Sequence, residues 1–239
     1  MTPMKFDPLV SETSERLYGL NALVELVYRA TPDVELQERD ALNQLAEHEN
    51  WDYGDYSVED QFLEVKFRHW LPKLAAYSII ILLSSIVETQ LLAYAKRVGE
   101  REKSAFEPND LKGPFLERAA KYVKKVSGSV LTKNPRWETL RNLQELRDII
   151  VHRAGKPGGD KKPQVEQMIE RMRYPGISLD ENPYAITADC ELSFSIHSCR
   201  YFAGEVEQFF KDLFKDAGLP VTGLWPNIES GFRAEGNSS

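Results

Sequence analysis

The sequence has few cysteines and lacks the short motifs that mark the common enzyme classes. Its 239 residues include two cysteines, Cys190 and Cys199, so disulfide bonds are not expected to hold the fold together, and a reducing compartment is expected. The four histidines show no metal-ligand spacing with cysteine or glutamate, and neither HExxH nor CxxC occurs. No GxxxxGK[ST] phosphate loop, dinucleotide-type GxGxxG or GxSxG is present. These absences argue against NTPases, dinucleotide enzymes, zinc proteases and α/β-hydrolases, and no cofactor or metal is expected.

Long hydrophobic runs are also missing. The segment Met1–Val10 has one lysine and no apolar core, unlike a signal peptide. The most apolar stretch, Leu74–Val87, is shorter than the roughly 20 residues that cross a bilayer. We interpret it as a helix in the core of a bundle, and we expect a cytoplasmic protein that does not associate with membranes.

The pattern that is present is mostly helical. Apolar residues at spacings of three and four predict helices at residues 11–30, 57–70, 72–98, 114–126, 135–153 and 190–214, with weaker candidates at 34–48 and 165–172. Thr31-Pro32 is expected to end the first helix and Gly99 the third. Two short strands, Ile177–Asp180 and Tyr184–Thr187, are expected to flank a turn. Because strands and helices do not alternate, the predicted fold is all-α, a helical bundle with a small β-hairpin before the last long helix.

Charge is unevenly distributed along the chain. The formal net charge is −7, which does not suit a protein that is cationic all over. The segment Lys112–Arg173, however, contains 15 lysines and arginines and 7 acidic residues. This basic segment indicates a surface that faces a polyanion such as RNA. Alternatively, these charges pair with the acidic remainder or solvate helix faces.

The most informative segment, Arg141–Arg153, reads RNLQELRDIIVHR. It contains Arg147, the polar Asp148, three apolar residues and then His152. This arrangement resembles the Arg-x4–6-His motif of the HEPN superfamily, in which the residue after the arginine is commonly polar. The earlier apolar helix with an acid at its end, and the long helix after the motif, also resemble HEPN domains.

The resemblance covers about residues 57–216. Residues 1–56 are then expected to form an N-terminal helical extension, and residues 217–239 a flexible tail. The resemblance implies a ribonuclease that needs no metal and acts as a toxin, in phage defence or in RNA processing. Many such proteins are homodimers in which two motifs face each other across a cleft. The expected partners are therefore RNA, a second copy of the chain and, for a toxin, a neutralising protein.

The chemistry of RNA cleavage suits these residue types. An arginine such as Arg147 can hold the scissile phosphate, and a histidine such as His152 can act as general acid or base because its ordinary pKa of about 6.5 is near working pH. Asp148, four residues before His152, could orient the imidazole or form a surface ion pair. The expected RNA-binding residues are Arg141, Arg153 and Lys156.

The spacing of the two motif residues raises a geometric problem. Five residues place Arg147 and His152 roughly 140° apart on an ideal helix. They could meet at one phosphate only if the helix unwinds near His152 or if a second subunit supplies one of them. Two alternatives therefore stay open: a non-catalytic HEPN-like module for dimerisation or for binding a partner or RNA, and a bundle that binds a small ligand around the apolar helix Leu74–Tyr94.

Overall fold

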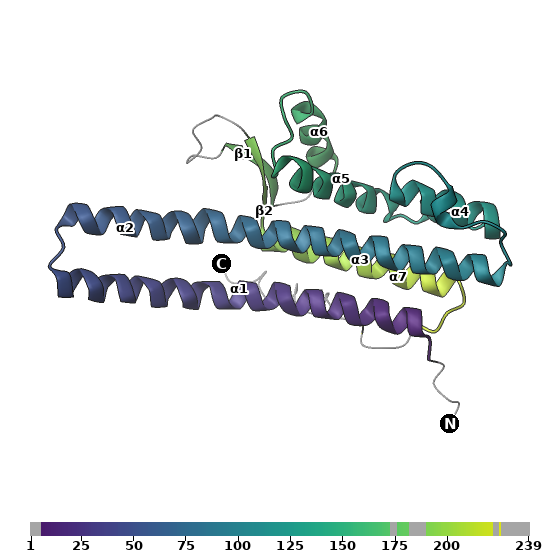
Figure 1. Ribbon diagram of the computed structural model, residues 1–239, viewed down its shortest axis with the longest axis horizontal. Helices are drawn as coiled ribbons and strands as arrows, with labels where there is room; N and C mark the ends of the chain where they lie inside the picture. The colour runs from purple at the N-terminus through teal and green to yellow at the C-terminus, as the bar shows by residue number, and fades with distance from the viewer. Residues whose placement is uncertain (1–5, 173–175, 182–189, 222–224, 226–239) are drawn as a thin grey trace, which may run out of the picture.

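A long antiparallel helical hairpin dominates the structure, a computed structural model that describes residues 6–172, 176–181, 190–221 and 225. Its first half is α1 (Pro8–Glu49), and its second half joins α2 (Tyr53–Val65), the π-helical turn η1 (Lys66–Trp70) and α3 (Leu71–Arg101) without a break. Figure 1 shows that the turn between α1 and α2 lies far from the remaining elements. We call this projecting part, residues 32–70, the arm.

α1 is longer than the sequence suggested. Asp7 caps its start by accepting hydrogen bonds from the N–H groups of Leu9 and Val10 at 3.1 and 3.3 Å. The prediction that Thr31-Pro32 ends the helix was wrong, and the separate helix predicted at 34–48 is the second half of α1. A proline in a helix removes one backbone hydrogen bond. Contacts with α2 and η1 hold the part of α1 beyond Pro32, including the Arg39–Asp60 and Lys66–Glu38 ion pairs, both at 2.5 Å.

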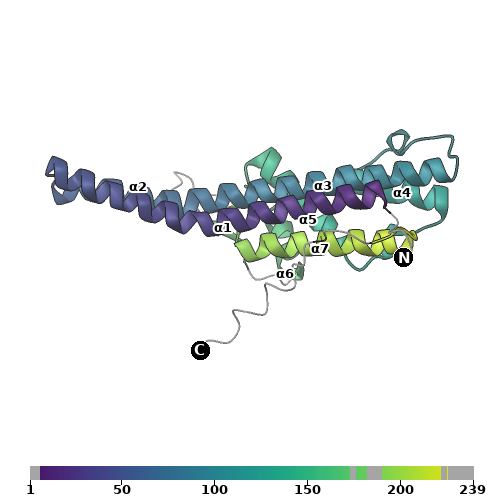
Figure 2. The ribbon, with the colours of Figure 1, turned by 90° about the horizontal axis from the view of Figure 1, so that it is seen from below.

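α3 is the central helix of the bundle. It packs against α1, α4 (Phe115–Ser127), α5 (Trp137–Arg153) and α7 (Ile196–Asp216), and Figure 2 shows α1, α3 and α7 running side by side. Short 3-10 turns, η2 (Pro108–Asp110) and η3 (Leu131–Lys133), flank α4. The all-α helical bundle is thus confirmed. The first half of α1 contributes to the same core, so residue 56 is not a boundary of that core; the contributing residues are Leu9, Val10, Leu17, Leu20 and Val24.

Gly99 does not end α3, contrary to the prediction, because the helix continues to Arg101. A Cβ at Gly99 would lie 2.1 Å from the hydroxyl of Tyr122 on α4. The glycine therefore allows the close approach of α3 and α4 rather than marking a helix end.

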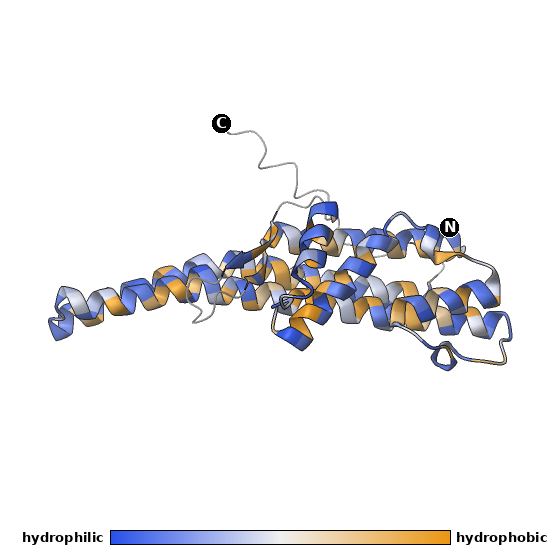
Figure 3. Ribbon diagram, turned by 90° about the horizontal axis from the view of Figure 1, so that it is seen from above, coloured by the Kyte–Doolittle hydropathy of each residue, from blue (hydrophilic) through white to orange (hydrophobic). Residues whose placement is uncertain are grey.

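The segment Tyr53–Arg101 is long and apolar enough to cross a membrane by length and composition alone, and 39% of its most apolar window is buried. The core helix of a bundle has the same composition, so this finding is weak evidence for a membrane. Figure 3 shows hydrophobic residues gathered in the bundle, whereas the tip of the arm is mostly hydrophilic.

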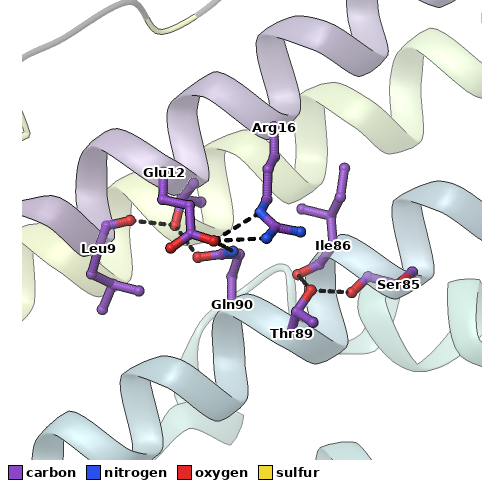
Figure 4. A network of polar contacts seen from close by, with 8 residues as sticks. Leu9, Glu12, Arg16, Ser85, Ile86, Thr89 and Gln90 are labelled. Atoms are coloured by element: carbon purple, nitrogen blue, oxygen red, sulfur yellow. Dashed lines mark hydrogen bonds and ion pairs between the residues drawn. The ribbon is translucent and has the colours of Figure 1, made fainter.

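A polar contact fixes how α1 lies on α3. Gln90 of α3 is 1% exposed. Its amide nitrogen donates to Glu12 at 3.5 Å, and its amide oxygen accepts from the Thr13 hydroxyl at 2.9 Å. Glu12 in turn accepts hydrogen bonds from Arg16 (Figure 4). A buried amide must find partners, so this contact favours one register of the two helices.

The β-hairpin before the last long helix is confirmed, but one of its strands is not where we predicted it. β1 (Ile177–Glu181) pairs antiparallel with β2 (Cys190–Phe194), with Ile177 opposite Phe194. The strand predicted at Tyr184–Thr187 lies outside the described residues. The prediction that the last helix begins at Cys190 was wrong, because α7 begins at Ile196 with Ser195 as its N-cap. α6 (Lys162–Met172) precedes the hairpin.

Part of the predicted tail packs on the bundle. Leu219, Val221 and Trp225 lie against the core, and the Trp225 ring is 6.3 Å from the ring of Phe214 on α7. The other residues after Val221 are outside the described part of the chain.

Candidate functional site at the end of α5

The motif residues lie on the last two turns of α5. Leu143, Leu146 and Ile150 are buried on the face that packs in the core. Arg147 and Asp148 are partly exposed at the edge of that face, and His152 is exposed. The amphipathic pattern of this helix therefore places the polar motif at the surface.

Arg147 and Asp148 form an ion pair within the motif. A guanidinium nitrogen of Arg147 donates to the Asp148 carboxylate at 2.8 Å. Within the described residues, His152 has no hydrogen bond or ion pair. In a single chain, Asp148 thus contacts the arginine and does not orient the imidazole.

A single chain does not bring Arg147 and His152 together. α5 stays α-helical through Arg153, and Ala154 then takes the left-handed conformation with φ 51°. The helix therefore does not unwind before His152. The roughly 140° between the two side chains, which follows from the helical repeat, remains.

A cationic pocket follows directly after the motif. It has a volume of about 420 Å³ and is lined by Arg153, Lys156, Lys162, Cys190 and the loop residues Pro157, Gly158 and Gly159. Three of these side chains are cationic and none is acidic. Around the pocket, the charges are partly balanced: Arg153 is 3.7 Å from Asp160, and Lys156 is 3.8 Å from Glu191.

Lys162 and Cys190 meet inside this pocket. The Lys162 ammonium lies 3.0 Å from the Cys190 sulfur. The contact with Cys190 raises the pKa of the Lys162 ammonium above its ordinary value. A cationic pocket of this kind can receive an oxyanion such as an RNA phosphate.

Gly155 anchors the end of α5 to the bundle. Its φ is 85°, and a Cβ would lie 1.9 Å from the Tyr77 hydroxyl of α3. Its carbonyl accepts a hydrogen bond from the Leu192 N–H at 2.9 Å. The Tyr77 hydroxyl donates to the Leu192 carbonyl at 2.8 Å. Burial, followed by the nearby Glu191 carboxylate, raises the pKa of Tyr77, so the hydroxyl keeps the proton that it donates.

Of the predicted RNA-binding residues, the structure brings two together. Arg153 and Lys156 line the cationic pocket. Arg141 lies three turns earlier on α5 and pairs with Glu138 at 3.1 Å, with its side chain 56% exposed. Lys162 and Cys190 were not predicted as site residues, although Lys162 belongs to the basic segment.

Comparison of the chain with protein-family models, with curated proteins and with solved structures finds no match.

Proposed function

We propose that the chain is a metal-independent endoribonuclease of the HEPN type that acts as a homodimer. The observation that carries the proposal is the exposed imidazole of His152, which has no hydrogen bond or ion pair within the described residues and directly precedes Arg153, a lining residue of a pocket with three cationic side chains. An exposed imidazole in the same region of the chain as a cationic pocket suits acid–base cleavage of RNA.

In the proposed reaction, the ribose 2′-oxygen attacks the adjacent phosphorus. A new bond forms between that oxygen and phosphorus, and the bond from phosphorus to the 5′-oxygen breaks. His152 of one copy accepts the 2′-hydroxyl proton, and a solvent water donates a proton to the leaving 5′-oxygen. Arg147 offsets the charge that develops on the phosphoryl oxygens. The products are a 2′,3′-cyclic phosphate and a 5′-hydroxyl.

The homodimer is part of the proposal because one chain keeps Arg147 and His152 on different faces of α5. A second copy can supply the missing member of the pair across a two-fold axis.

α3 offers an exposed stripe for a contact between two copies. Leu71, Leu74 and Leu82 are 38, 57 and 44% exposed, and Ser78 and Ser85 lie on the same face. These positions have the three- and four-residue spacing of a helix-packing seam.

The test is cleavage of RNA in the presence of EDTA. We expect wild-type protein to release 5′-hydroxyl products, and Arg147→Ala and His152→Ala to lose cleavage by at least 100-fold while they retain RNA binding. Arg29→Ala on α1 and His197→Ala on α7 are matched controls, because both residues are exposed and lie outside the site. Cleavage that persists in both motif variants, or that needs a divalent ion, would contradict the proposal.

A second candidate function is a non-catalytic HEPN-like module for dimerisation or for binding RNA or a protein, including a neutralising partner. The ion pair between Arg147 and Asp148 favours it, since this pair engages the arginine within its own chain. RNA binding or self-association without cleavage of any RNA by wild-type protein would support this candidate against the first.

A further inference from the structure

Charge is divided between the two ends of the molecule. The outer part of the arm, residues 40–64, contains eight acidic residues and no lysine or arginine, and seven of the eight are exposed. We call this part the acidic tip. Residues 96–133, at the end of α3 and around α4, contain ten lysines and arginines and five acidic residues. We call this region the basic end.

The acidic tip and the basic end do not neutralise each other within one chain. Figure 1 shows the turn between α1 and α2 at one end of the long axis, and α4 with the end of α3 at the other. Exposed charges that lie much more than about 8 Å apart are screened at physiological salt. The separation therefore leaves two surfaces of opposite charge for contact with a second molecule.

An exposed apolar stripe runs between these two regions on the continuous helix of α2, η1 and α3. On the arm, Val58, Phe62 and Trp70 are 66, 50 and 40% exposed. The ring centroids of Phe62 and Trp70 are 5.6 Å apart, so the π-helical turn keeps both rings on one side of the helix. On α3 the stripe continues through Leu74 and Leu82, which belong to the proposed contact between two copies.

Complementary charges lie at equal distances from the middle of the stripe on α3. Ser78 is the middle of residues 71–85 and is exposed. Lys96 follows it by 18 residues, which is five helical turns, so Lys96 lies on the same face about 27 Å away. Glu59 precedes Ser78 by 19 residues, or about 28 Å. If two copies pack antiparallel with an axis at Ser78, Glu59 of each copy reaches Lys96 of the other, and Asp55 reaches Arg101.

From these features, we infer that two copies of the chain pack antiparallel along α3, so that the acidic tip of each copy docks on the basic end of the other. The same two surfaces meet twice across the two-fold axis, as in other isologous dimers. This inference rests on the homodimer of the proposed function but not on RNA cleavage. Gly155, just after the motif helix, lies against Tyr77, so α5 of each copy ends at the level of the axis.

The experiment is sedimentation velocity of the full chain without RNA. Two double variants reverse the charge of one surface each: Asp55→Lys with Glu59→Lys on the acidic tip, and Lys96→Glu with Arg101→Glu on the basic end. Each is expected to weaken the dimer at least tenfold. An equal mixture of the two should form a heterodimer within threefold of the wild-type affinity, because the reversed tip then faces the reversed end and the two unaltered surfaces also meet.

Asp40→Lys with Glu47→Lys is the matched control. It changes the charge of the acidic tip by the same amount, but on α1, the half of the arm that does not carry the stripe, and both residues are exposed. We expect it to change the affinity less than threefold. Equal weakening by this control and by the Asp55 and Glu59 variant would overturn the inference.

The outcomes separate this inference from the proposed nuclease. A dimer that keeps its affinity in both charge-reversal variants, or a mixture that does not recover it, would overturn the antiparallel arrangement and leave RNA cleavage to be judged by its own assay. Recovery in the mixture without RNA cleavage by wild-type protein would support the arrangement and count against the nuclease. A wild-type chain that stays monomeric would contradict both.

Discussion

Replacing Gly155 by alanine tests how the end of the motif helix is held. Gly155 has a φ of 85°, and its Cβ would meet the Tyr77 hydroxyl at 1.9 Å. The left-handed conformation costs alanine about 1 kcal/mol relative to glycine. The hydroxyl must also move, which breaks its buried hydrogen bond to the Leu192 carbonyl and adds about 1–3 kcal/mol. The expected loss in the free energy of unfolding is therefore about 2–4 kcal/mol.

The measurement is urea unfolding followed by circular dichroism, with Gly128→Ala as the matched control. Gly128 ends α4 with a φ of 77°, and a Cβ there meets nothing within 4 Å. We expect this variant to lose only about 1 kcal/mol. A Gly155→Ala loss no larger than the Gly128→Ala loss would refute the described contact between Gly155, Tyr77 and β2. Tyr77→Phe removes the same hydrogen bond, so its loss should not add fully to that of Gly155→Ala.

Two further ion pairs give predictions for the same unfolding assay. Asp7→Asn keeps an N-cap for α1 but removes the pair with Arg97, so we expect a loss of about 2 kcal/mol at pH 7. The hydrogen bond from Arg97 holds the pKa of Asp7 below its ordinary value. The difference in the free energy of unfolding between wild type and Asp7→Asn should therefore be complete above the unfolded-state pKa of about 3.9 and shrink as the pH falls through the lower folded-state pKa. A difference that does not change down to pH 2 would contradict this prediction. Lys73→Ala removes the ammonium 2.7 Å from the buried Glu191 carboxylate and should lose about 2–3 kcal/mol. Lys121→Ala, which breaks an exposed pair, should lose under about 0.5 kcal/mol, and equal losses for the two lysines would count against a buried Glu191.

The helical bundle could be predicted because apolar periodicity is a local signal, whereas helix ends depend on distant contacts. Pro32 looks like a helix end, but pairing between the two halves of the arm outweighs one lost hydrogen bond. Gly99 also looks like a helix end, and the reason for the glycine is the Tyr122 hydroxyl, 23 residues later in the chain. The sequence predicts a helix at Cys190–Phe194 because the pairing of this segment with Ile177–Glu181 cannot be read from the segment itself.

The candidate site likewise has one part that a short segment predicts and one part that depends on distant contacts. Arg147, Asp148 and His152 could be selected from one short segment, and the structure places them at the surface at the end of α5. The cationic pocket also needs Lys162 and Cys190, which are 28 residues apart and meet only because β2 returns to the start of α6. No local spacing contains that information.

The most direct test of the central claim mixes the Arg147→Ala and His152→Ala proteins. If each site combines Arg147 of one copy with His152 of the other, random exchange of subunits makes half of the dimers mixed, and each mixed dimer has one intact site. We predict that the mixture recovers about a quarter of the wild-type cleavage rate, although each variant alone is inactive. A mixture that contains mixed dimers by native mass spectrometry and still does not cleave RNA would contradict a site shared between two copies.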